Sequence, residues 1–100
     1  MAQTPERKVK DKVTAILRNH GVYYFFPPSN GFGRAGIPDI IACYKGIFLA
    51  FECKAGSNKP TALQLRELDN IRNAGGIAVV INETNVETVR TIIAQLGETK

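Results

Sequence analysis

The sequence predicts an α/β fold in which three helices and four strands follow the order αβββαβα. Three observations support this prediction. Apolar residues recur at helical spacing near the N-terminus and in two later stretches. Short β-branched and aromatic runs lie between the helical stretches, and glycine or proline ends most of them. The 100 residues, 44% hydrophobic and 22% charged, predict a single globular domain (1–100) with one modest core.

The first predicted element is a helix. Thr4 is a candidate N-cap, Pro5 suits the first helical position, and His20-Gly21 ends the helix. Its apolar positions are Val9, Val13, Ile16 and Leu17. An aromatic strand is expected next, over Val22–Phe26. Its aromatic side chains could stack on bases, but such a run is more typical of a core or interface strand.

A glycine-rich loop, Ser29 to Pro38, separates this strand from two apolar strands. The two strands are predicted over Asp39–Tyr44 and Ile47–Lys54, with Lys45-Gly46 as the hairpin turn. Their apolar residues do not alternate cleanly with polar ones. We therefore expect helices to cover both faces of the sheet.

The second predicted helix begins at Thr61, which forms a capping box with Gln64. The helix ends at Gly75-Gly76, and a fourth strand follows over Ile77–Ile81. We expect the buried stripe of this helix to consist of Leu65, Leu68 and Ile71.

A third helix completes the predicted fold. Thr84 or Asn85 caps it, and it extends through Leu96. Its expected inner face consists of Val86, Val89, Ile92, Ile93 and Leu96.

The composition limits the possible partners and environments. Lysine and arginine number 13 against 9 acids, and the net charge of +4 favours a polyanionic partner without establishing one. Two cysteines and one histidine provide neither a disulfide framework nor a four-ligand zinc site. The N-terminal residues lack the apolar stretch of a signal peptide, and no run is long enough to span a membrane. We therefore expect a cytoplasmic protein.

The predicted hairpin brings charged residues together. Counting back from the Lys45-Gly46 turn places Asp39 opposite Glu52, and Lys54 projects from the same face. Opposed carboxylates repel unless a cation lies between them, and Mg²⁺ often binds one or two carboxylates with water. Acids and lysines are also common at exposed strand ends, which is the alternative explanation of this pattern.

These residues form part of a recognisable motif. Gly36-Ile37-Pro38-Asp39, followed after the hairpin by Glu52-Cys53-Lys54, resembles the signature of the PD-(D/E)XK nuclease superfamily. Within that superfamily the chain is similar to the virus-type replication-repair nuclease (VRR-NUC) domain, over nearly its whole length. The resemblance implies a restriction-endonuclease-like core, in which helices flank a mixed four-stranded sheet. It also implies metal-dependent hydrolysis of DNA by an endonuclease, in a bacterial or phage-infected cell.

The resemblance assigns roles to individual residues. Asp39 and Glu52 would bind Mg²⁺ or Mn²⁺, with the main-chain carbonyl of Cys53 as a third ligand. Lys54 would position or activate the attacking water. Gln64 would support the site, although capping alone also explains this residue.

Further candidates surround this set. The resemblance implies that Glu6 is an outer metal ligand, although the helix dipole alone favours an acid in the first turn. Arg34, in the glycine-rich loop, is a candidate phosphate contact, and Lys59 and Arg66 are candidates for DNA backbone contact. A run of positive charge on the first helix is either a DNA-tracking stripe or a solvated face; it consists of Arg7, Lys8, Lys10 and Lys12.

The resemblance also implies a substrate and an assembly. Small stand-alone members resemble junction resolvases, which are homodimers that present two sites to branched DNA. A four-way Holliday junction is therefore the expected substrate, with flap or nicked DNA as the next possibility. The alternative from another functional class is a non-catalytic DNA-binding module that retains the nuclease fold.

Overall fold

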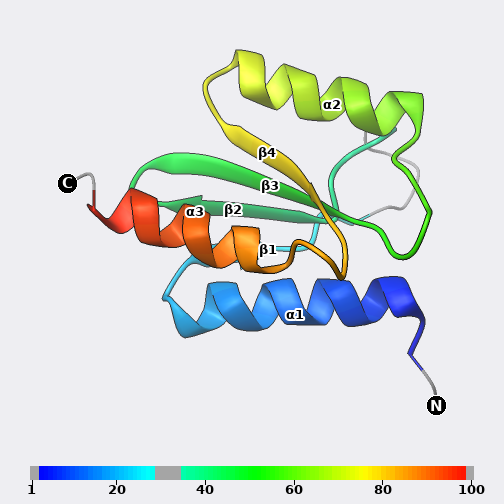
Figure 1. The fold of residues 1–100 in the computed structure, drawn as a ribbon. Coiled ribbons are helices and arrows are strands. Elements are labelled where there is room, and N and C mark those ends of the chain that lie inside the picture. Colours follow the sequence, from blue (N-terminus) through cyan, green and yellow to red (C-terminus); the bar gives the residue numbers. More distant parts are fainter. Residues whose placement is uncertain (1–2, 29–34, 99–100) are drawn as a thin grey trace.

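The computed structural model describes residues 3–28 and 35–98, and its elements follow the predicted order (Figure 1). The elements are α1 (Pro5–Asn19), β1 (Tyr23–Phe25), β2 (Ile40–Tyr44), β3 (Ile47–Cys53), α2 (Ala62–Asn73), β4 (Ile77–Ile81) and α3 (Glu87–Glu98). The predicted α/β class and the order αβββαβα are confirmed.

The four strands form one mixed sheet in the order β1-β2-β3-β4. The β1–β2 and β2–β3 pairs are antiparallel, and β3 pairs with β4 in parallel. The turn between β2 and β3 lies at Lys45 and Gly46, whose φ values of 54° and 82° are typical of a two-residue type I′ hairpin. The hairpin register runs from Tyr44↔Ile47 to Ile40↔Phe51, as counting from the turn predicts.

Helices cover both faces of the sheet, as expected. Helices α1 and α3 lie on one face and α2 lies on the other (Figure 1). The main core, between the sheet and the α1–α3 layer, is centred on Leu17, Phe51 and Ile93, each at most 1% exposed. A smaller cluster of Ala50, Leu68 and Ala78 lies under α2.

Helix α1 begins and ends as predicted. The Thr4 hydroxyl accepts a hydrogen bond from the Arg7 amide, and Gly21 adopts φ = 70° after the His20 C-cap. The Val22 amide donates to the Leu17 carbonyl at 3.0 Å. Because this bond belongs to the helix end, β1 begins at Tyr23, one residue later than predicted.

Helix α2 shows the predicted capping box, but the predicted stripe is wrong at one position. Leu68 is fully buried and Ile71 is half-buried, whereas Leu65 is 47% exposed. The side of α2 that faces the sheet follows Gln64, Leu68 and Ile71, and Leu65 is rotated about 100° from Gln64. The acid Glu67 is buried in place of Leu65.

Helix α3 begins at Glu87, later than the predicted caps. Asn85 Oδ1 accepts a hydrogen bond from the Asn82 amide, and the Thr84 hydroxyl donates to Asn82 Oδ1. Both predicted caps are therefore engaged in the turn that precedes the helix. The predicted inner face is confirmed, since Val89 and Ile93 are buried and the other three residues pack against the core.

Part of the sheet is left uncovered on the α2 side. Tyr23 and Phe25 of β1 pair with Cys43 and Ile41 of β2, and Cys43 pairs with Phe48 of β3. We call Tyr23, Phe25, Cys43 and Phe48 the open face. Tyr23 is 69% exposed, while Phe25 and Phe48 are nearly half exposed. The aromatic strand therefore does not lie in the core on this side.

Within residues 3–28 and 35–98, none of the helices combines the length and the apolar character needed to cross a membrane.

Candidate active site

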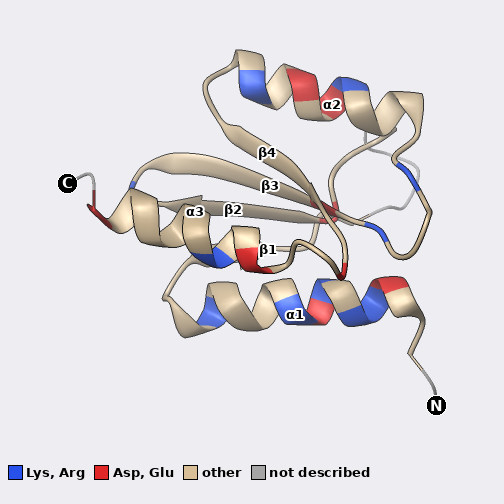
Figure 2. Ribbon diagram, in the orientation of Figure 1, with Lys and Arg blue, Asp and Glu red and all other residues tan. Residues whose placement is uncertain are grey.

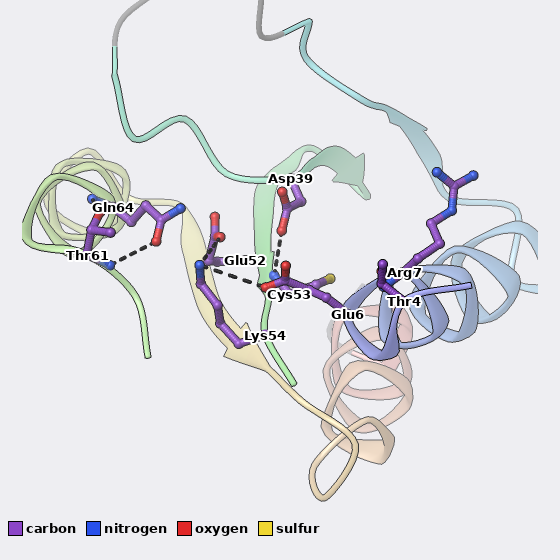
Figure 3. Close-up of polar contacts among 9 residues, drawn as sticks. All are labelled: Thr4, Glu6, Arg7, Asp39, Glu52, Cys53, Lys54, Thr61 and Gln64. Atoms are coloured by element: carbon purple, nitrogen blue, oxygen red, sulfur yellow. Dashed lines mark hydrogen bonds and ion pairs between the residues drawn. The ribbon is translucent and has the colours of Figure 1, made fainter. Parts of the chain in front are cut away.

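Charged residues gather at the end of the β2–β3 hairpin that lies away from its turn. Asp39 immediately precedes β2, and its Oδ2 accepts a 2.8 Å hydrogen bond from the Cys53 amide at the end of β3 (Figure 3). The strand pairing stops at Ile40↔Phe51, so Asp39 is not paired with Glu52 in the ladder as the register suggested. Its carboxylate instead bonds to the main chain beside Glu52.

Glu52 is a buried acid with an unsatisfied oxygen. It is only 2% exposed, and its Oε2 lies 3.5 Å from Lys54 Nζ. Its Oε1 is buried and has no hydrogen-bond partner among residues 3–28 and 35–98. Burial, reinforced by the charge of Asp39, raises the pKa of Glu52 to about 7, although Lys54 opposes this rise.

Lys54 connects the sheet to α1. Its ammonium also lies 3.8 Å from Glu6 Oε2, and the lysine side chain is 14% exposed (Figure 3). Glu6 shares a face of α1 with the buried residues Val9 and Val13, which directs it towards the end of β3. The structure therefore brings Glu6, Asp39, Glu52 and Lys54 together at one end of the sheet.

Gln64 is occupied by the helix cap. Its side-chain Oε1 accepts a hydrogen bond from the Thr61 amide at 2.9 Å, and its own amide donates to the Thr61 hydroxyl at 3.2 Å. Both bonds complete the predicted capping box. A supporting role for Gln64 in the site stays a prediction.

Two of the predicted DNA contacts, Lys59 and Arg66, lie outside this cluster. Lys59 is exposed on the loop between β3 and α2, and Arg66 is exposed on α2. Arg66 borders a hollow of about 310 Å³ together with Ala35 and Leu63. Arg34 falls outside the described residues. Their contact with DNA stays a prediction.

Arg7 and Lys10 of α1 adjoin the site. A hollow of about 200 Å³ is lined by Thr4, Glu6, Arg7, Lys10, Asp39 and Cys53. Arg7 also pairs with Asp11, and Lys10 Nζ lies 4.4 Å from the centre of the Phe26 ring. Both residues belong to the positive run identified in the sequence, and Lys10 shares a face with Glu6, four residues before it.

The side chains at the hairpin end can be compared with the needs of a metal ion. Among residues 3–28 and 35–98, no three His, Cys, Asp or Glu side chains form a ready ligand group. Mg²⁺ does not need three such groups, because it commonly binds one or two carboxylates and keeps several waters. Asp39 and Glu52 meet that requirement, and the unpartnered Oε1 of Glu52 is a free oxygen ligand. The donor set fits a hard divalent cation.

Comparison with known proteins places nucleases among the relatives of this chain. The family model for archaeal Holliday junction resolvases (Hjc) matches residues 4–96. The "Putative nuclease p44" of Acyrthosiphon pisum secondary endosymbiont phage 1 is 31% identical over 81 residues, which cover 80% of this chain and 84% of that protein.

Two solved structures share the fold. A VRR_NUC domain superposes with a TM-score of 0.71 at 23% identity, over 89% of this chain and 97% of that one. Hjc of Archaeoglobus fulgidus, a Holliday junction resolvase from an archaeal hyperthermophile, superposes with a TM-score of 0.58 at 21% identity. The superposition covers 76% of this chain and 66% of that one. The predicted restriction-endonuclease-like fold is confirmed. With the match over residues 4–96, the chain belongs to the Hjc family of nucleases, which confirms the nuclease resemblance carried by its Asp39 and Glu52-Cys53-Lys54 motifs.

Proposed function

We propose that this protein is a metal-dependent endonuclease that hydrolyses phosphodiester bonds in branched DNA, with the four-way Holliday junction as its preferred substrate. The observation that carries the proposal is the convergence of Asp39 and Glu52 beside Lys54, with one buried carboxylate oxygen left unpartnered. A binding-only module has no need of such a costly group. Membership of the Hjc family supports junction DNA as the substrate.

Each residue of the site has a chemical task in this proposal. The carboxylates of Asp39 and Glu52, with the main-chain carbonyl of Cys53, would hold Mg²⁺ or Mn²⁺. Such an ion, when bound, acidifies water and stabilises charge on phosphate oxygens. The Lys54 ammonium orients the attacking water by hydrogen bonding and offsets developing negative charge. Glu6, whose Oε2 lies 3.8 Å from Lys54 Nζ, would keep that ammonium at the strand end, and its role as an outer metal ligand stays a prediction.

Positive charge lies on both sides of these residues. Lysines and arginines follow α1 and the loop between β3 and α2 (Figure 2). Arg7 and Lys10 border the hollow that contains Asp39, and Lys59 lies on the loop. We propose that these cations contact DNA phosphates on either side of the scissile bond, with Arg34 and Arg66 as further contacts.

Cleavage of four-way, flap, nicked and linear DNA with Mg²⁺, Mn²⁺ or EDTA tests the function. We expect the wild type to cut the four-way junction fastest, and EDTA to abolish cutting. Asp39→Asn and Lys54→Ala should each lower the single-turnover rate about 100-fold or more. Asp69→Asn, on the exposed side of α2, and Lys45→Asn, in the distant turn, are matched controls that should cut normally.

Two outcomes would refute the catalytic assignment. The first is a folded wild type that binds junctions but cuts none of the substrates with either metal, which would identify a binding module. The second is an Asp39→Asn variant that cuts as fast as the wild type.

We propose further that the protein acts as a homodimer that associates through the open face. Symmetric cleavage of a junction needs two sites, and this chain has one set of the proposed catalytic residues. Tyr23, Cys43 and Phe48 form one row across β1, β2 and β3, with neighbouring strands about 4.8 Å apart. A two-fold axis through Cys43 would therefore place Tyr23 of each copy on Phe48 of the other.

The hollow beside Phe48 supports this arrangement. It has a volume of about 370 Å³ and lies between the start of β3 and the C-terminal half of α2. Ile71, Ala74 and Gly76 contribute to its walls, so it can accept an aromatic ring. The open face therefore has a projecting aromatic side chain and, beside Phe48, a recess lined by apolar residues together with Glu67 and Asn70.

Sedimentation at micromolar concentration tests the dimer. We expect a dimeric wild type and a monomeric Phe48→Glu variant, because the new charge would be buried at the interface. Leu63→Glu is the matched control, since Leu63 is similarly exposed but lies on α2 away from this row. A wild type that sediments only as a monomer would contradict the dimer and leave the nuclease proposal intact.

We propose the cytoplasm of a bacterial or phage-infected cell as the location of the protein. The phage origin of the p44 relative and the unpaired Cys43 and Cys53 support this location. Expression of a fluorescent fusion in bacteria tests it, and an export of the fusion from the cytoplasm would contradict it.

A further inference from the structure

Glu83 ties the turn after β4 to the loop that follows Lys54. Both of its carboxylate oxygens accept a hydrogen bond from the Gly56 amide, at 3.2 and 3.0 Å. Gly56 is two residues beyond Lys54 and adopts φ = 61°. The bond joins two turns that are 27 residues apart in the sequence. Glu83 therefore holds the chain directly after the proposed catalytic lysine.

The turn that carries Glu83 is itself restrained by hydrogen bonds. Asn85 Oδ1 accepts from the Asn82 amide at 2.7 Å, and Asn85 Nδ2 donates to the Val80 carbonyl at 3.0 Å. Asn82 Oδ1 accepts from both the amide and the hydroxyl of Thr84. These bonds fix the turn to the end of β4, so Glu83 projects from a rigid base.

The main chain around Lys54 is thus held from two sides. The Lys54 amide donates to the Ile81 carbonyl at 2.9 Å, and Ala55 is 8% exposed. Gly56 is the next residue, where Glu83 binds. A lysine side chain is flexible, so the position of its ammonium depends on how well its main chain is held. Here that ammonium must remain within reach of both Glu52 and Glu6.

The same hydrogen bond borders an opening next to the site. A hollow of about 260 Å³ lies between the first turn of α1 and this loop. It is lined by Thr4, Pro5, Glu6, Ala55, Gly56 and Asn58. Release of Gly56 from Glu83 would free one wall of this hollow.

We propose that Glu83 is a positioning residue for the nuclease reaction, and that it acts by holding Gly56 so that Lys54 stays beside Glu52. The inference rests on the catalytic role proposed above for Lys54. Glu83 lies on the β4–α3 turn and contacts Gly56, not the carboxylates of the site. Its effect on catalysis passes through the hydrogen bond, not through its charge.

Two substitutions separate the hydrogen bond from the charge. Glu83→Ala removes both, whereas Glu83→Gln removes the charge but keeps an oxygen that can accept from Gly56. We expect Glu83→Ala to lower kcat on a four-way junction about tenfold with KM unchanged or lower. Glu83→Gln should retain kcat within about twofold. Glu87→Ala, which removes an exposed acid that contacts Arg90, is the control for charge.

A spectroscopic measurement tests the same contact without activity. In lysine-labelled protein, NMR should show a shifted Lys54 side-chain signal in Glu83→Ala and a wild-type signal in Glu83→Gln. Amide exchange at Gly56 should be faster in Glu83→Ala. If Glu83→Ala does not fold, the shorter Glu83→Asp replaces it. We then expect a smaller shift of the Lys54 signal and a smaller rise in the Gly56 exchange rate.

The outcomes distinguish this inference from the proposed function. If the folded wild type cuts no DNA, the nuclease proposal fails, and the role of Glu83 in catalysis fails with it. If the wild type cuts, unchanged Lys54 and Gly56 signals and an unchanged kcat in Glu83→Ala refute the inference alone. Equal loss of kcat in Glu83→Gln and Glu83→Ala refutes it too, because charge would then be the cause. An effect of Glu83→Ala that disappears in a Lys54→Ala background supports it.

Discussion

Glu52 is held out of water next to another acid, and this position affects the stability of the metal-free protein. The ordinary pKa of a glutamate is 4.5, whereas burial raises the pKa of Glu52 to about 7. Between these values the folded protein keeps a proton that the unfolded chain has lost. Stability therefore decreases as the pH rises from 4.5 to 7 and stays low above that range. The difference corresponds to about 3 kcal/mol.

Urea unfolding in EDTA tests this effect. We expect the free energy of unfolding of the wild type to fall by about 2–3 kcal/mol between pH 5 and pH 8, relative to Glu52→Gln. Glu52→Gln has no titrating group at this position and serves as the reference for all other groups. If the difference in free energy of unfolding between the wild type and Glu52→Gln stays constant across this range, Glu52 titrates normally.

The position of Gly36, between the loop before Asp39 and helix α2, requires a glycine. Its φ is 84°, and a Cβ at this position would lie 2.5 Å from the Leu63 carbonyl oxygen. The chain at Gly36 therefore lies directly against the first turn of α2. The motif glycine permits both the backbone conformation and this close approach.

Gly36→Ala and Gly46→Ala separate these two requirements. Gly46 has a nearly identical φ of 82° but has open space around it. We expect Gly46→Ala to cost about 1–2 kcal/mol from the backbone alone. Gly36→Ala should cost about 2–4 kcal/mol because the overlap adds to it. Denaturant unfolding measures both free energies. Equal losses of stability in the two variants would show that the overlap of the new Cβ with the Leu63 carbonyl relaxes at no cost.

Elements whose signals are local were predictable from the sequence. The Lys45-Gly46 turn determined the hairpin register, and the Thr61–Gln64 capping box located the start of α2. Leu65 was misassigned because helical spacing alone does not say which side of a helix meets the sheet. The start of α3 was misplaced because Asn85 bonds to Asn82, a competition that spacing does not reveal.

The convergence of the site was also predictable, but its details depended on tertiary structure. Counting along the hairpin brought Asp39, Glu52 and Lys54 together, and the family resemblance added Glu6 to them. The Asp39 bond to the Cys53 amide depends on the point at which strand pairing stops. The contact of Glu83 with Gly56 joins turns far apart in the sequence, and no local pattern indicates it.

For the whole molecule, the two cysteines should differ sharply in reactivity. Cys43 is exposed on the open face, whereas burial raises the pKa of the Cys53 thiol to about 12. If copies associate about an axis near Cys43, mild oxidation should link two chains through this residue. Non-reducing electrophoresis should then show a dimer for Cys53→Ser and only monomer for Cys43→Ser. Absence of a cross-link in a protein that sediments as a dimer would place the axis elsewhere.

The position of the two acids on the hairpin determines when they come together during folding. Asp39 and Glu52 lie at the end of the hairpin opposite the Lys45-Gly46 turn. A hairpin that closes from its turn brings these acids together last, after every rung of the ladder has formed. Above the pKa of Glu52, which is about 7, their mutual repulsion is then absent from the folding barrier and present in the finished protein. Relief of that repulsion, as in Asp39→Asn, should slow unfolding and leave the folding rate nearly unchanged. The acids proposed for catalysis would therefore shorten the lifetime of the native state without delaying its formation.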